Sequence, residues 1–373
     1  MGQQEPTKKE VLLLGSGGVG TIGALNLEVG GQASVTAVLR SNFKAVTDNG
    51  FSITSCDHGN VTGWRPSHSM YYSGRYWHLL TISAVVGRVP TTTEQQFDYI
   101  VVTTKNVPDC PPTVTDLIAP AVIPGRTVIV LIQNGLNIET PIFERFPDNI
   151  CLSGVSMIGS HEVAHGVIEH EYPDELILGA FHNPRLDEKT EEAAAREFIE
   201  MYSAGGKTAC TFAENVPYSR WRKLIYNACL NSTCAVTGLD TGRIRMANDT
   251  VAALVRPAME EIRAAAAAAG VQLEADICDT MINLDPLTMY LSPSMLIDVQ
   301  KVRCSFQPLI DVSNAAQGHF TEVENLVGEP LRTGTALGVS MPTLSVLYSL
   351  LKAMQWRTME KRGLVTIPPR TES

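Results

Sequence analysis

A polar stripe on an otherwise apolar segment is the clearest chemical signal in the sequence. Lys223, Asn227 and Asn231 recur every fourth residue in WRKLIYNACLN. On an α-helix this spacing places the three side chains along one face. A lysine ammonium can donate a proton, and amide side chains can hold a polar substrate without adding charge. A solvent-facing stripe is the alternative, although asparagine is a mediocre helix former, and both interpretations stay open.

A glycine cluster near the N-terminus is the second signal. It follows the aliphatic run 11–14, precedes the helix-like TIGALNLEVGG, and consists of Gly15, Ser16, Gly17, Gly18, Val19 and Gly20. Backbone N–H groups at a helix start carry partial positive charge, and glycines let a pyrophosphate approach them. The order of strand, turn and helix therefore predicts a dinucleotide site, against the alternative of a turn that serves packing alone.

Arg40 indicates which dinucleotide would bind. It ends the next strand-like run, VLR, and Asn42 and Lys44 follow it. At this place, about 20 residues beyond the glycines, NAD sites usually offer a carboxylate to the ribose, whereas an arginine accommodates the 2′-phosphate of NADP. The residues favour NADP(H), and the alternative is a solvated arginine at a strand end.

Two more polar residues follow strand-like runs. Lys105 ends VVTTK, and Asn134 ends VIVLIQN. Ligands bind at the carboxyl ends of the strands in open parallel sheets. The pair therefore predicts a rim for cofactor and substrate.

A competing motif is His161-Glu162-Val163-Ala164-His165, which matches HExxH. On a helix this motif presents two zinc ligands and a general base. Gly166 follows at once and the next residues are strand-like, so the imidazoles do not converge. The eight cysteines form no CxxC pair, and we expect no metal.

The elements that must position these residues differ between the two halves of the chain. Aliphatic runs at 11–14, 34–39, 99–104 and 127–132 suit a parallel sheet buried on both faces. Helical patterns dominate after Pro217, at 218–232, 250–269, 321–337 and 343–360. We predict an α/β protein, with an N-terminal Rossmann-type doubly wound sheet and a C-terminal all-helical domain that begins near residue 213. Residues 57–97 suggest extra strands or a surface excursion.

Composition excludes several classes of protein. The 373 residues are enough for two domains, and 29 Lys plus Arg against 39 Asp plus Glu give a net charge of −10, which would repel nucleic acid. No apolar run reaches the roughly 18 residues that cross a bilayer, and MGQQEPTKKE lacks the apolar middle of a secretory signal. We therefore expect a cytoplasmic protein with reduced cysteines and no membrane partner.

From about Glu10 to Arg362 the chain resembles the ketopantoate reductase family, 2-dehydropantoate 2-reductase. The resemblance consists of the glycine turn, an arginine after the second strand, a strand-end Lys and Asn-Gly, the W-x-K-L-x-x-N-x-x-x-N helix and a late Thr-Glu-Val, in the family's order.

This resemblance implies an NADP-binding domain over 9–212 and a catalytic, substrate-binding domain over 213–365. It implies Lys223 as general acid and Glu322 as partner of the substrate hydroxyl or of the lysine. The implied substrate contacts are Asn134, Asn227, Asn231 and Ser305. The implied NADP(H) contacts are Gly15, Ser16, Gly17, Gly18, Val19, Gly20, Arg40, Lys105 and Asn134.

Two departures from the family pattern concern the substrate. Where the family commonly has Ser-Met-x-x-Asp, residues 305–311 read SFQPLID, and Thr241 precedes Gly242 where an asparagine is common. The expected reaction is NADPH-dependent reduction of 2-dehydropantoate to pantoate. Another 2-oxo acid or a bulky ketone, and a non-catalytic NADP(H) sensor, stay open as alternatives. The expected partner is a small-molecule substrate, and a homodimer is left open.

Overall fold

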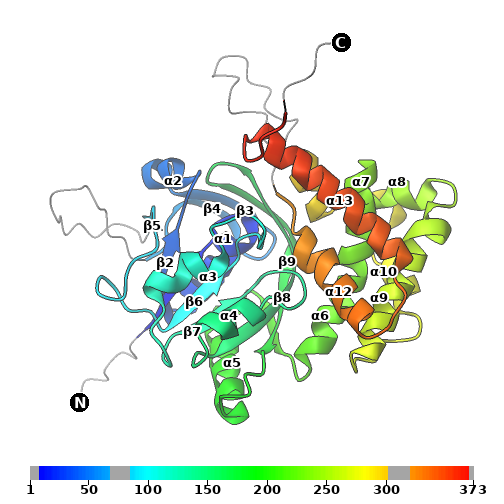
Figure 1. Cartoon of the computed structure of the whole chain (residues 1–373). Coiled ribbons are helices and arrows are strands. Elements are labelled where there is room, and N and C mark those ends of the chain that lie inside the picture. Colours follow the sequence, from blue (N-terminus) through cyan, green and yellow to red (C-terminus); the bar gives the residue numbers. More distant parts are fainter. Residues whose placement is uncertain (1–7, 68–84, 301–319, 369–373) are drawn as a thin grey trace, which may run out of the picture. The chain divides into compact units, whose positions relative to one another are not determined.

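The computed structural model describes residues 8–67, 85–300 and 320–368 (Figure 1). The chain forms two compact units. The N-terminal unit contains the described residues up to Asn106, Pro112–Gln133 and Ile138–Val216. The C-terminal unit contains Val107–Pro111, Asn134–Asn137 and the described residues from Pro217 onward. Two short loops that leave the sheet thus belong to the helical unit.

A ten-stranded mixed sheet forms the centre of the N-terminal unit. Its order is β4-β3-β9-β8-β7-β6-β1-β2-β5, and β10 pairs with β9. The strands are β1 (Lys9–Leu14), β2 (Ala33–Val38), β3 (Phe51–Ser55), β4 (Gly59–Trp64), β5 (Val85–Val86), β6 (Tyr99–Val102), β7 (Val128–Leu131), β8 (Cys151–Ala164), β9 (Val167–Ala180) and β10 (Ala209–Phe212). Strands β2 and β6 flank β1 and are both parallel to it. The order therefore reverses at β1, the place where open α/β sheets bind ligands.

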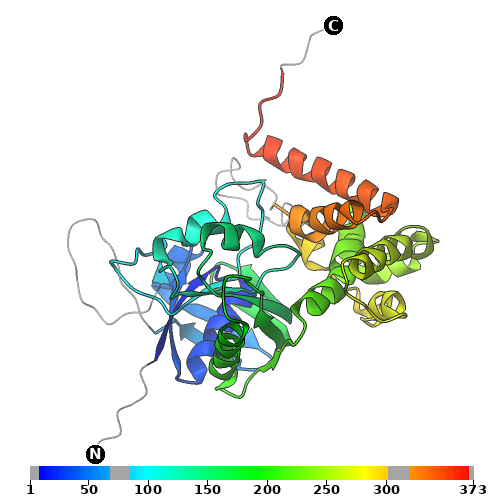
Figure 2. The same cartoon turned by 60° about the horizontal axis from the view of Figure 1, so that its bottom comes forward.

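Helices cover both faces of this sheet, which confirms the doubly wound prediction. Val11 and Leu13 of β1 pack in a core with residues of α1 (Gly18–Val29) and α5 (Glu188–Ser203). Leu12 and Leu14 pack on the opposite face with residues of α3 (Val114–Ile118), η1 (Ala119–Ala121) and α4 (Thr140–Arg145). Figure 2 shows the cyan helices on one side of the strands and the blue and green ones on the other. Helix α2 (Phe43–Asn49) follows β2.

The sheet is less regular than the sequence predicts, because β8 and β9 form a long antiparallel hairpin. The HExxH match at His161–His165 lies at the end of β8 and in the turn to β9, so it is not helical. In the 57–97 segment, β4 pairs antiparallel with β3 and β5 pairs parallel with β2, while residues 68–84 lie outside the described part of the chain.

The described part of the C-terminal unit is helical. Its elements are α6 (Val216–Ile225), η2 (Tyr226–Asn231), α7 (Ser232–Thr237), α8 (Thr241–Met246), η3 (Val251–Val255), α9 (Arg256–Ala268), α10 (Ile277–Ile282), η4 (Leu287–Met289), α11 (Ser294–Gln300), η5 (Glu324–Gly328), α12 (Glu329–Ala336) and α13 (Pro342–Lys361). Their apolar faces share one core that includes Ile225, Met259 and Leu344. Among the helices of the described residues, none combines the length and apolarity that crossing a bilayer requires.

Three of the expected α-helices contain a π-helical turn. These turns are η2 within 218–232, η3 within 250–269 and η5 within 321–337. A π-turn shifts the backbone hydrogen bond from i→i+4 to i→i+5, and such turns are frequent at functional sites. The prediction of helical segments did not distinguish these π-turns from α-helix.

Candidate functional site

The first and last glycines of the glycine turn meet structural demands. Gly15 has φ +106°, and a Cβ there would lie 2.7 Å from the Thr104 backbone nitrogen. A Cβ at Gly20 would overlap the Gly15 carbonyl oxygen. The first glycine therefore permits the turn from β1, and the last lets α1 pack closely on it, as dinucleotide-binding turns require.

Gly17 and Ser16 have properties that packing does not explain. A Cβ at Gly17 would meet no described atom within 4 Å, although φ at this residue is −81°, which any residue can adopt. Gly17 caps α1 without a side-chain hydrogen bond, and the first turn of the helix has no acidic residue. Beside it, the buried Ser16 hydroxyl has no hydrogen-bond partner among the described residues. Open space, helix N–H groups and an unused hydroxyl fit a pyrophosphate.

Gly18 and Val19 pack against the protein. A Cβ at Gly18 would overlap the Ser160 carbonyl of β8, and Val19 is half-buried against the core. Strand β8, which carries the HExxH match, therefore packs directly against the glycine turn at Gly18.

Asn42 ties the segment after β2 to the glycine turn. Its buried amide nitrogen donates to the Ser16 carbonyl oxygen at 2.9 Å and to Glu162 Oε1 at 2.8 Å. Glu162 also accepts the Gly166 backbone N–H at 3.0 Å, so the glutamate of the HExxH match has a structural role. These hydrogen bonds of Asn42 keep the exposed Arg40, two residues earlier, close to the glycine turn. Sequence reasoning missed this connection.

The two lysines near this rim are placed differently. Lys44 is exposed and pairs with Asp48 at 2.6 Å on α2, so its charge already has a local partner. Lys105 is exposed three residues beyond β6. Of these cations, Arg40 is the better candidate for a phosphate contact.

Asn134 and Glu322 meet in the C-terminal unit. The Asn134 amide donates to Glu322 Oε2 at 3.5 Å, and Glu322 is buried just before the helical turn that leads into η5. Asn325 holds the loop Asn134–Asn137 by two hydrogen bonds. Its backbone carbonyl accepts the Leu136 N–H at 2.9 Å, and its side-chain amide donates to the Leu136 backbone carbonyl at 3.1 Å. Gly135 has φ +103°, and a Cβ there would lie 2.5 Å from Asn325 Cβ.

Helix α6 holds the same loop through Arg220. Its Nη1 donates to the Gly135 carbonyl at 2.9 Å, and Arg220 is buried. Lys223 is half-buried one turn further along α6, on the face that it shares with Arg220. The helix therefore turns its Lys223 face toward the Asn134 loop.

Asn227 and Asn231 touch each other as their spacing predicts. Asn231 donates to Asn227 Oδ1 at 2.9 Å within η2. Both are buried, with relative exposures of 8% and 3%, so the solvent-facing alternative is wrong for them. The Asn231 amide oxygen is buried and has no hydrogen-bond partner among the described residues, which leaves it able to accept a bond from a ligand.

Ser305 lies outside the described residues. Sequence reasoning also missed Arg220 and Asn325, which hold the Asn134 loop, and Thr103, whose hydroxyl bonds to the Gly15 carbonyl. No periodicity or motif marks any of the three.

Comparison with known protein families identifies both halves of the chain. Residues 11–183 match the family model "Ketopantoate reductase PanE/ApbA", and residues 215–305 and 312–355 match its C-terminal counterpart. The chain belongs to the ketopantoate reductase family. It is an oxidoreductase of that family.

Members and structural neighbours of the ketopantoate reductase family match nearly the whole chain. "Uncharacterized protein YDL144C" of Saccharomyces cerevisiae is 34% identical over 97% of this chain and 98% of its own. A 2-dehydropantoate 2-reductase structure from Methylococcus capsulatus is 28% identical with a TM-score of 0.70, covering 94% of this chain and 97% of that one. A D-mandelate dehydrogenase, solved with NADH and anilino(oxo)acetate, shares the fold at 19% identity and a TM-score of 0.71, covering 94% and 99%.

Proposed function

We propose that this protein reduces a 2-oxo acid with NADPH and that 2-dehydropantoate is its substrate. The observation that carries the proposal is the Asn134–Glu322 contact, held by Arg220 and Asn325 on the side of α6 that carries Lys223. Family membership supports the reaction class. The substrate rests on the resemblance to ketopantoate reductases.

In this proposal each residue either stabilises charge that develops on the substrate or holds the substrate in position. NADPH, when bound, supplies the hydride. Lys223 donates a proton to the ketone oxygen as negative charge develops on it, an effect worth roughly 10² to 10⁴ in rate. Glu322 and Asn134 orient the oxygen or the lysine. The Asn227–Asn231 pair offers a buried amide acceptor to a substrate hydroxyl and adds no charge.

Substrate identity is tested by following NADPH absorbance with ketopantoate, other 2-oxo acids and bulky ketones. We expect the highest kcat/KM with ketopantoate. A higher value with another ketone would favour the alternative substrate class, which the altered residues at 305–311 and Thr241 support. NADPH binding without turnover of any substrate would favour the sensor.

Arg40→Asp should shift coenzyme preference from NADPH toward NADH. Loss of a charge-assisted phosphate contact is worth about 1.5–3 kcal/mol, so the ratio of kcat/KM for the two coenzymes should fall about 10- to 100-fold. Lys44→Ala is the control, because Lys44 pairs with Asp48 and should leave the ratio unchanged. If Arg40→Asp keeps the preference and Lys44→Ala loses it, another cation holds the phosphate.

Gly17→Ala should weaken NADPH binding without destabilising the fold. The methyl group has room in the protein but would stand where we place the pyrophosphate, so KM for NADPH should rise at least about tenfold. Thermal unfolding should change little. Gly20→Ala is the contrasting variant, since its methyl group would overlap Gly15 and should lower Tm. An unchanged KM for NADPH in Gly17→Ala would place the pyrophosphate elsewhere.

A further inference from the structure

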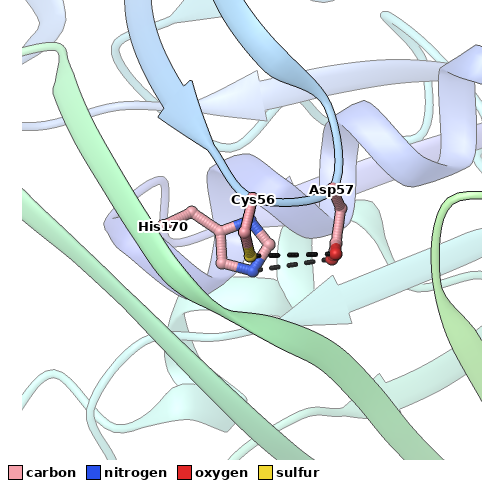
Figure 3. Close-up of side chains that lie close together, drawn as sticks. All are labelled: Cys56, Asp57 and His170. Carbon is pink, nitrogen blue, oxygen red and sulfur yellow. Dashed lines mark hydrogen bonds and ion pairs between the residues drawn. The ribbon is translucent and has the colours of Figure 1, made fainter.

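Three side chains with metal-ligating atoms, those of Cys56, Asp57 and His170, gather in the N-terminal unit (Figure 3). Cys56 and Asp57 follow the end of β3, and His170 belongs to β9. One ligand atom from each residue lies within 4.8 Å of the other two. The cluster thus joins two segments of the sheet that are far apart in the sequence.

The backbone fixes all three ligands. Ser55 of β3 pairs with His170 in the parallel ladder, and the Cys56 N–H donates to the His170 carbonyl at 2.9 Å. The Asp174 N–H donates to Asp57 Oδ2 at 3.0 Å. The sheet register therefore sets the positions of the ligands before any ion binds.

The His170 ring is oriented toward the cluster. Its side chain is fully buried, and Nδ1 lies 2.8 Å from the Ser55 hydroxyl. Nε2, on the cluster side, has no hydrogen-bond partner among the described residues, and a buried polar atom without a partner is costly. The Ser55 hydroxyl also accepts the Asp57 and His58 backbone N–H groups at 3.1 and 3.0 Å, so without a metal it donates to Nδ1 and Nε2 carries the ring proton. Binding of an ion at Nε2 must move this proton to Nδ1, the arrangement found in metal-binding histidines.

Two of the separations between ligand atoms, each to a different oxygen of Asp57, are slightly longer than those around a tetrahedral ion. Cys56 Sγ lies 3.7 Å from Asp57 Oδ1, and His170 Nε2 lies 3.7 Å from Asp57 Oδ2. The second distance is too long for an N–H···O hydrogen bond. Zinc bonds of about 2.0–2.3 Å place tetrahedral ligand atoms about 3.3–3.6 Å apart, so small adjustments would complete the site.

We propose that Cys56, Asp57 and His170 bind Zn²⁺, with water as the fourth ligand. A thiolate and a carboxylate would neutralise the two charges of the ion, and mixed sulfur, nitrogen and oxygen ligands suit zinc. Because Cys56 is exposed, water can reach the fourth position. The ion would fasten the β3–β4 turn to β9. Our expectation of no metal rested on cysteine spacing and HExxH, neither of which involves this cluster.

Titrating the metal-free full chain with Co²⁺ tests the site. We expect one equivalent to bind, with thiolate-to-cobalt charge-transfer absorption and the visible bands of tetrahedral cobalt, and Zn²⁺ to abolish both. Cys56→Ala should lose the charge-transfer absorption. Cys110→Ala should retain it and is the matched control, since Cys110 is also a partly exposed thiol next to an aspartate, Asp109.

Stability gives a second measurement. Zn²⁺ should raise Tm of the wild-type chain with increasing concentration and leave Tm of Asp57→Asn unchanged, because binding stabilises only a fold that holds the site. EDTA should lower Tm without changing NADPH-dependent turnover, which keeps this test independent of the proposed reaction. The absence of charge-transfer absorption in the wild type, or its persistence in Cys56→Ala, would overturn the proposal.

Discussion

We expect Lys223→Ala to lower kcat by about 10² to 10⁴ and to leave NADPH affinity nearly unchanged. The variant removes the proposed proton donor, and this loss corresponds to about 3–5 kcal/mol of the barrier. The glycine turn and Arg40, which we propose hold NADPH, lie in the other unit of the chain. Stopped-flow or steady-state NADPH absorbance gives kcat, and NADPH fluorescence titration gives the affinity.

Arg222→Ala is the matched control for Lys223→Ala. Arg222 is the preceding residue of α6 and is also basic, and it lies 3.8 Å from Glu274 in a partly exposed ion pair. Such pairs contribute up to about 1 kcal/mol, so Tm should change slightly and kcat should not. Unchanged turnover in Lys223→Ala would remove this residue as the acid. Equal losses in both variants would instead indicate damage to α6.

The centre of the sheet could be predicted because its signals are local. The run 11–14 is buried on both faces, so every residue is aliphatic, and the glycines follow at once. The β8–β9 hairpin gave a weaker signal. Strand β8 begins in the core and β9 ends in it, but the portions next to their turn are polar and exposed. There the alternation of apolar and polar residues is lost, and the HExxH match at His161–His165 resembles a zinc motif without being helical.

The π-turns could not be predicted from side-chain patterns. Apolar spacing predicts that a segment is helical, but the choice between i→i+4 and i→i+5 hydrogen bonds depends on packing along the whole helix. The Asn227–Asn231 contact was predicted nevertheless, because residues four apart lie close together in both kinds of turn.

The supports of the candidate site depend on contacts between distant residues. Arg220 binds a backbone carbonyl 85 positions away, and Asn325 binds one 189 positions away. A sequence shows that such residues are polar but not that they hold a loop. Glu322 shares this limitation, and only the family resemblance selected it among the acidic residues. The Cys56–His170 cluster likewise required the β3–β9 register.

We expect Glu322→Gln to lower kcat by about 10² while Tm changes little. The amide keeps the size of the side chain and can still accept the Asn134 bond, but it loses the negative charge that would orient the lysine or the substrate hydroxyl. Asn134→Ala alone should also slow turnover, and should cost less when added to Glu322→Gln. A double-mutant cycle on kcat measures this coupling, which we expect to be about 1–2 kcal/mol.

Glu324→Gln separates this role from a structural one. Glu324 is the first residue of η5, two residues after Glu322, and its carboxylate accepts hydrogen bonds from Arg332 at 3.0 Å, Tyr348 at 2.9 Å and Lys352 at 2.8 Å. These partners pin η5 to its neighbours, so loss of the charge should lower stability by about 1–3 kcal/mol and leave kcat nearly unchanged. If Glu324→Gln slowed turnover as much as Glu322→Gln, the effect of Glu322 would come from the position of η5, because Glu322 lies just before η5 and the two carboxylates have different partners.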